Sequence, residues 1–175
     1  MLPTIAIEPR GPVRTHLNLQ ERLGLTVRGS FVVERKDPAG RMVDRRVMRN
    51  TIVSAGQDLL AGYLATGTLA ASAIWVAIGI GTDTTAPTTN DTNLGARTGN
   101  GIAGTSTKPA SRVWQMTAAF ASNNPAGTAA IVEAAVFDRT STTGFTMWAR
   151  QTFAVINKGA SDNINMTYAV TFNAG

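Results

Sequence analysis

The sequence predicts a mainly β protein: an antiparallel β-sandwich or jelly-roll-like domain with one packed helix at about 52–65 and an extended N-terminal arm. Three observations lead to this prediction. Apolar and polar residues alternate through the last segment, 164–172, as in a strand with one buried face. Turn-forming residues recur at short, regular intervals between Val113 and Phe172. Only the stretch at 52–65 places apolar residues at helical spacing.

Residues 1–24 are expected to form an arm outside the folded domain. Three prolines within the first twelve residues exclude a continuous helix. Apolar residues lie between these prolines at near-alternate positions, as anchors on an extended segment would. The alternative is a frayed terminus. The candidate partner contacts of this arm are Leu2, Ile5, Ile7, Arg10 and Arg14.

The remainder, 25–175, is expected to be a single β-rich domain that begins with a basic hairpin at 25–49. Pro38 and Gly40 suit the turn between the two strands of this hairpin. Both strands carry many basic residues, which discourage pairing along an exposed strand edge. The sequence therefore predicts an exposed, positively charged ribbon.

The helix has two candidate starts. Asn50 is suited to cap it, whereas Ser54 and Gln57 form a capping box that starts it one turn later. Gly67 stands where a C-terminal glycine cap is expected. The apolar stripe of the helix consists of Ile52, Leu59, Leu60, Tyr63 and Leu64.

After the helix, the short apolar run Ile74–Ile78 is interpreted as a buried strand. Gly79 and Gly81 follow it, and they permit either a bend or the close approach of another segment. Residues 86–110 are crowded with Gly, Asn and Pro and are expected to form a long loop. Further strands are predicted at Arg112–Phe120, Thr128–Phe137 and Phe145–Ile156, and at about 164–172.

Glu133 interrupts a strand that is apolar on both faces and is therefore expected to be central in a sheet. Burying a carboxylate costs several kcal/mol unless it is paired, so a cationic partner is required. Arg150 in the next strand is the natural partner, and Arg97 and Arg112 are the alternatives. A catalytic role needs a second acid, and only Asp138 is close in sequence. A structural ion pair between Glu133 and Arg150 is favoured.

The residue inventory argues against an enzyme. There is no cysteine, and His16 is the sole histidine, so a metal centre or a catalytic triad is hard to build. Gly79 and Gly81 resemble the start of a dinucleotide-binding loop, but Thr84 breaks the pattern. Asp83 and Asp91 fit no calcium-loop spacing and are interpreted as turn-formers. No cofactor, metal or small-molecule substrate is expected.

Charge is unevenly distributed along the chain. Residues 1–50 hold ten Lys/Arg and five Asp/Glu, a net of +5, which equals the net charge of the whole chain. This asymmetry indicates an acidic partner, either nucleic acid or an acidic protein surface. Nucleic acid is disfavoured because acids are interspersed with the basic residues and Phe31 is the only aromatic residue among them. With neither a signal peptide nor a run of transmembrane length, we expect synthesis in the cytoplasm and no membrane partner.

Six segments follow one another in a recognisable order between about 50 and 173. They are Asn50–Leu60, Ile74–Thr82, Ala86–Pro87, Asp91–Leu94, Val132–Phe137 and Met147–Phe153. This series resembles a group of small virion proteins of tailed bacteriophages. Ala135 departs from the pattern, where Gly is expected. The resemblance implies a structural protein of the virion head or tail, made in the host bacterial cytoplasm, with no catalytic residues.

Two placements in the particle compete. A capsid cement or decoration protein would use the arm to staple neighbouring subunits of the major capsid protein, and would self-associate as trimers on local threefold axes. A tail, collar or fibre-attachment component would use the same arm to dock on a tail ring protein. Cement is favoured because a basic, anchored arm suits an acidic shell. A glycan hydrolase would need paired carboxylates that the sequence lacks.

Overall fold

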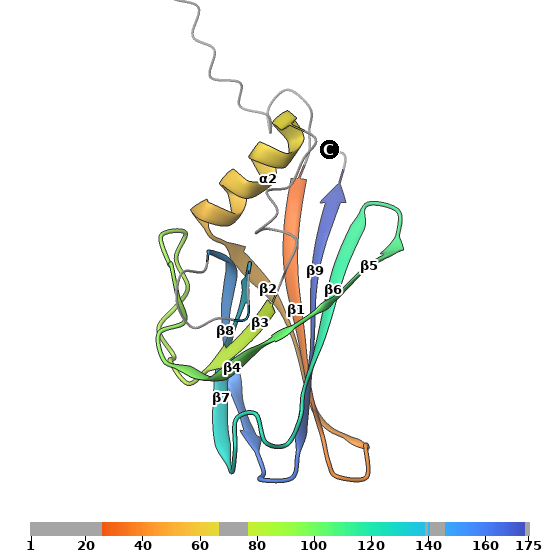
Figure 1. Ribbon diagram of the computed structural model, residues 1–175, viewed down its shortest axis with the longest axis vertical. Coiled ribbons are helices and arrows are strands. Elements are labelled where there is room, and N and C mark those ends of the chain that lie inside the picture. Colours follow the sequence, from red (N-terminus) through yellow and green to blue (C-terminus); the bar gives the residue numbers. More distant parts are fainter. Residues whose placement is uncertain (1–25, 67–76, 139, 141–145, 174–175) are drawn as a thin grey trace, which may run out of the picture.

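Nine strands and one helix make up the described part of the chain, residues 26–66, 77–138, 140 and 146–173 of a computed structural model (Figure 1). The predicted mainly β, sandwich-like class is confirmed. The elements are β1 (Thr26–Lys36), β2 (Met42–Ile52), α2 (Ser54–Thr66), β3 (Ala77–Gly81), β4 (Arg97–Ala103), β5 (Thr105–Ala110), β6 (Val113–Phe120), β7 (Ala129–Phe137), β8 (Met147–Lys158) and β9 (Asn163–Asn173).

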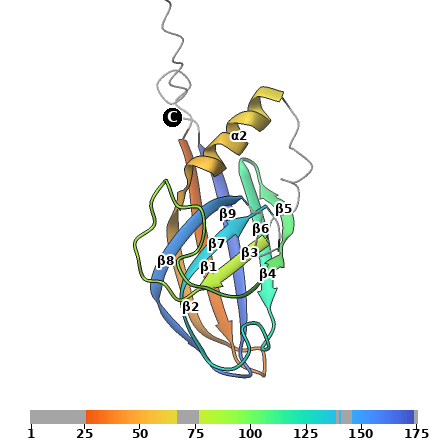
Figure 2. The same cartoon turned by 60° about the vertical axis from the view of Figure 1, so that its left-hand side comes forward.

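The strands follow the order β4-β3-β7-β8-β2-β1-β9-β6-β5, and every neighbouring pair is antiparallel. They fold into two facing layers (Figures 1 and 2). We call β2, β1, β9, β6 and β5 layer A, and β4, β3, β7 and β8 layer B. Strand β2 links the layers, because it pairs with β1 along most of its length and with β8 only through Thr51 and Ile52.

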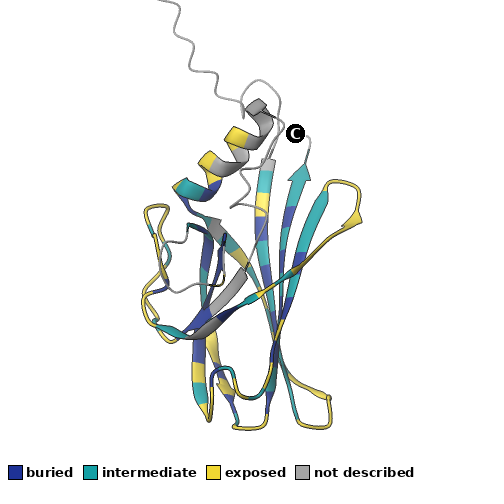
Figure 3. Cartoon of the chain, viewed as in Figure 1, coloured by how far each residue is buried: buried dark blue, intermediate teal, exposed yellow. Residues whose placement is uncertain are grey.

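The core lies between the two layers (Figure 3). In β9, the alternation predicted from the sequence is confirmed: Ile164, Met166, Tyr168 and Val170 are buried, while the residues between them are half-buried. Layer B contributes a central strand, β7, whose residues 131–137 are all buried. Because burial of large apolar side chains is the main driving force for folding, these facing surfaces hold the layers together.

Strands β4 and β5 follow one another in the chain and are separated only by Gly104. Strand β4 is the edge strand of layer B, and β5 is the edge strand of layer A. A Cβ atom at Gly104 would clash with the side chain of Met116, which is fully buried on β6. A glycine at this corner therefore lets the backbone cross from layer B to layer A directly over the core.

The helix starts at the later of the two predicted positions, near Ser54 rather than near Asn50. Asn50 and Ile52 belong to β2, because Asn50 pairs with Gly29 of β1 and Ile52 pairs with Ala149 of β8. Helix α2 therefore begins at Ser54. Its first turn lies against β8, where a Cβ atom at Gly56 would clash with the carbonyl of Trp148. The side chains of Leu59, Leu60, Tyr63 and Leu64, and all of Gly67, lie outside the described residues.

Two further predictions are wrong in part. The described strand β3 spans Ala77–Gly81, so Gly79 and Gly81 lie within a strand rather than after it; residues 74–76 are outside the described part. The predicted loop at 86–110 contains β4 and β5. All residues of β5 are exposed, so this edge strand carries no apolar alternation and is held by its backbone pairing with β6.

Candidate functional site

A cluster of charged side chains is buried in layer B, beneath the loop that joins β3 to β4. Glu133 comes from the middle of β7 and has no exposed surface, and Arg150 comes from β8 and is also buried. The Nε atom of Arg150 donates to Glu133 Oε2 at 3.0 Å, and Arg150 Nη2 lies 2.9 Å from the same oxygen. The structure thus brings together the two residues that sequence analysis pairs.

The same arginine also binds two aspartates that sequence analysis interprets only as turn-formers. Its Nη1 donates to Asp91 Oδ2 at 2.8 Å, and its Nη2 donates to Asp83 Oδ2 at 3.1 Å. Both aspartates also shape the loop: Asp83 accepts from the amide and hydroxyl of Thr85, and Asp91 accepts from those of Thr88. One cation therefore serves three carboxylates.

Backbone amides of the loop occupy the remaining acceptor positions of Glu133. Oε1 accepts from the amides of Asp83 and Ala96 at 3.2 and 3.0 Å, and Oε2 accepts from the amide of Gly95 at 3.2 Å. The loop comes this close because Gly81 has no side chain: a Cβ atom there would clash with the Glu133 carboxylate and lie 2.6 Å from the carbonyl of Ala96. Of the two roles predicted for Gly81, a bend or the close approach of another segment, the structure therefore shows the close approach.

Hydrogen bonding favours the charged forms of the groups around Arg150. Hydrogen bonds from Thr85, with a smaller contribution from the Arg150 charge, lower the pKa of Asp83. Burial by itself would raise the pKa of Asp91, but hydrogen bonds from Thr88 and Arg150 outweigh it and lower that pKa. Burial likewise opposes the charge of Arg150, yet its bonds to Asp91 and Glu133 raise its pKa.

These hydrogen bonds and ion pairs hold the loop between β3 and β4 against strands β7 and β8. Glu133 is fully buried, and both of its oxygens accept hydrogen bonds, so it is not placed to exchange a proton with a substrate. The other candidate partners lie elsewhere: Arg97 donates to the carbonyl of Thr140 and stacks over Phe137, and Arg112 is exposed. Asp138 is buried and accepts from the amide of Thr146.

A second buried cation, Lys158, lies at the other end of β8 from Arg150. Lys158 at the end of β8 donates to the carbonyls of Ser122, Gly127 and Gly159, at distances between 2.8 and 3.3 Å. Burial lowers its pKa, although the charge of Asp162 opposes this shift. Asp162 in turn pairs with Arg35 of β1 at 2.9 Å. No sequence signal identified this cluster, because the loops that it joins are far apart in the chain.

Most of the positive charge lies on the hairpin rather than the arm. Residues 26–52 hold seven Lys/Arg and three Asp/Glu, a net of +4, whereas residues 1–25 hold three and two, a net of +1. Three hairpin arginines form exposed or half-exposed ion pairs within the hairpin: Arg41 with Asp37, Arg45 with Glu34, and Arg46 with Asp44. The arm residues Leu2, Ile5, Ile7, Arg10 and Arg14 lie outside the described residues.

No protein-family model, curated protein or solved structure matches this chain. Among the described residues, no group of three or more His, Cys, Asp or Glu is placed to hold a metal ion. In the described part of the chain, no helix is long and apolar enough to cross a membrane.

Proposed function

We propose that this protein is a structural component of a tailed bacteriophage particle: a capsid cement or decoration protein that staples neighbouring capsid subunits through its N-terminal arm. Its partner is the major capsid protein, and it acts in the virion after synthesis in the host cytoplasm. The proposal rests on the resemblance of the segments between 50 and 173 to small virion proteins.

The observation that carries the proposal is the convergence of these segments around one site. Strand β3 pairs with β7, and β7 pairs with β8, so three of the resembling segments lie side by side in layer B. The amide of Val53 donates to the carbonyl of Trp148, which brings the segment around the helix start to β8. Asp91 reaches Arg150. The resemblance therefore concerns one connected structural unit rather than scattered matches.

A tail, collar or fibre-attachment component is the second candidate, and the same arm would then dock on a tail ring protein. Both placements predict that the arm gains its burial from a neighbour, because an extended segment has no core of its own. Each of Leu2, Ile5 and Ile7 would contribute about 1.5–3 kcal/mol if fully buried against that neighbour.

Deletion of residues 1–24 tests the proposal. All described strand pairings lie between Thr26 and Asn173, so the truncated protein is expected to keep its circular dichroism spectrum and melting temperature. Particles assembled with truncated protein should lack it on gels, and cryo-microscopy of particles with the full-length protein should place its density on the shell. Density on the tail would favour the second candidate. Normal incorporation of folded, truncated protein would contradict the stapling role.

A further inference from the structure

We infer that the free edge of β2 binds an extended, acidic segment of a partner protein, which adds to layer A as a further strand. This inference concerns a surface separate from the arm and goes beyond the proposed virion role. Within the described ranges, residues 42–49 of β2 lie beside β1 on one side and pair with no strand on the other. Unpaired amides and carbonyls of such an edge are a template for another strand.

Exposed apolar side chains gather along this edge. The large hydrophobic residues exposed in the described part of the chain are Met42 (57%), Val43 (50%), Val47 (59%) and Val155 (43%). The first three belong to β2, and Val155 lies on β8, the next strand in the sheet order, beyond the two residues at which β8 pairs with β2. An incoming strand would therefore find apolar contacts as well as hydrogen-bond partners.

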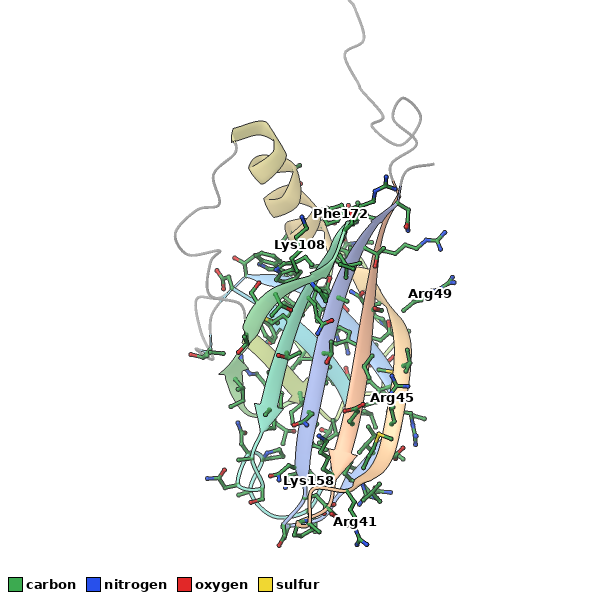
Figure 4. All side chains as sticks on the ribbon, turned by 90° about the vertical axis from the view of Figure 1, so that its right-hand side faces the viewer. Arg41, Arg45, Arg49, Lys108, Lys158 and Phe172 are labelled. Atoms are coloured by element: carbon green, nitrogen blue, oxygen red, sulfur yellow. The ribbon has the colours of Figure 1, made fainter. Side chains whose placement is uncertain are left out.

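The edge is also strongly basic. Residues 41–49 hold Arg41, Arg45, Arg46 and Arg49 against Asp44 alone, a net of +3. Arg49 projects outward from the hairpin and Arg41 lies at its turn (Figure 4), whereas Arg45 pairs with Glu34 of β1. Arg49 is exposed. The ion pair of Arg45 with Glu34 is partly exposed to solvent, so it contributes little to stability and can be exchanged for a pair with a new carboxylate.

The alternation along β2 specifies the chemistry of the partner. Successive side chains of a strand point to opposite faces, so Val43, Arg45, Val47 and Arg49 share one face. A strand paired with this edge would match it best by presenting apolar and acidic residues in turn on that face. The order of Val and Arg thus favours a protein segment of alternating apolar and acidic residues over a nucleic acid, because phosphates would leave the valines and the backbone edge unused.

A second copy of this chain is a poorer occupant. Pairing two such edges would bring together two segments of net charge +3 each. Like charges placed opposite one another destabilise a strand pair, and basic residues on edge strands are a common protection against self-association. The positive charge therefore selects against self-pairing while it favours an acidic strand.

The test uses a labelled nine-residue peptide as the probe, with Thr at alternate positions and Val and Glu in turn at the others. Its binding to the purified full-length protein is measured by fluorescence polarisation, and amide hydrogen exchange of the protein is measured with and without peptide. We expect binding that weakens with added salt, together with slower exchange within 42–49. A peptide with Lys in place of Glu should not bind.

Two double variants with the same change in charge localise the effect. Arg45→Glu with Arg49→Glu should weaken peptide binding at least about tenfold, since both long-range attraction and register are lost. Lys108→Glu with Arg112→Glu, at exposed positions on and next to β5, should bind as the unsubstituted protein does. Hydrogen exchange on the unsubstituted protein locates the contact even where a variant fails to fold.

Several outcomes would overturn the inference. Absence of peptide binding, equal loss of binding in both double variants, or protection confined to other strands would each exclude a site on β2. A single-stranded oligonucleotide that binds more tightly than the peptide and protects 42–49 would assign the surface to nucleic acid. A dimer in the absence of peptide, with 42–49 protected, would assign it to a second copy. Because no virus particle is used, these outcomes are separate from failure of the proposed virion role.

Discussion

The molecule uses pairs of arginine and carboxylate in two regions with opposite surroundings. Around Arg150, the fully buried Glu133 and the half-buried Asp83 and Asp91 share a single guanidinium between β7, β8 and the loop at 82–96. On the hairpin, the side chains of Arg45 and Glu34 are 49% and 29% exposed. Burial decides what each pair does. A buried pair positions the chain because its partners cannot be replaced by water, whereas an exposed pair leaves its charge available to a partner.

Removing one member of the buried network is expected to have the largest effect. Glu133→Ala should lower the free energy of unfolding by about 3–5 kcal/mol, because it removes one counter-charge of Arg150 and leaves the amides of Ala96 and Gly95 unpaired. For a chain of this size the melting temperature should fall by roughly 6–20 °C. Urea unfolding and thermal melting measure both quantities. An unchanged melting temperature would show that the network does not hold the loop.

A substitution at Gly81 tests the packing that lets the loop reach Glu133. Gly81→Ala should cost about 1–3 kcal/mol, because the new methyl group overlaps the Glu133 carboxylate and the carbonyl of Ala96. Gly62→Ala is the matched control: Gly62 is an exposed helical residue, and an added Cβ atom would meet no other atom within 4 Å, so this change should stabilise the protein by roughly 0.5–1 kcal/mol. Equal effects of the two substitutions in urea unfolding would exclude a specific requirement at Gly81.

Acid should weaken the loop attachment. The pKa values of Asp83 and Asp91 are lowered in the folded protein, so the unfolded chain binds protons more readily below about pH 4. The stabilisation is therefore fully present above the unfolded pKa and is lost as the pH falls through the folded values. Urea unfolding between pH 2 and 6 should show a shallower decline for Asp91→Asn than for the unsubstituted protein. Identical slopes would mean that Asp91 does not contribute.

Strands with one buried face could be predicted from the sequence, and exposed edge strands could not. Ile164, Met166 and Tyr168 alternate with polar residues because β9 has the core on one side only. Strand β5 faces water throughout, so its residues Thr105–Ala110 carry the composition of a loop, and only its pairing with β6 makes it a strand. That pairing is a tertiary contact, which local composition does not record.

Only part of the candidate site could be predicted from the sequence: the pair of Glu133 with Arg150, but not the contacts of Asp83 and Asp91. An acid within an apolar strand needs a cation, and this requirement leads from Glu133 to Arg150. The contacts of Asp83 and Asp91 depend on how a loop folds back over β7 and β8, which their turn-forming sequence does not reveal. One signal points to them: a guanidinium has five N–H donors, more than one carboxylate usually satisfies, so a buried arginine calls for further acceptors.

Paired double-mutant cycles test the central claim most directly. The claim is that burial makes the Glu133–Arg150 ion pair structural, whereas exposure leaves the charge of Arg45 available to a partner. One cycle combines Glu133→Gln with Arg150→Met, and the other combines Glu34→Gln with Arg45→Met, so the chemical changes are identical. Urea unfolding should give a coupling free energy of about 2–3 kcal/mol for the buried pair and below about 1 kcal/mol for the exposed pair. Equal coupling energies in the two cycles would contradict the account.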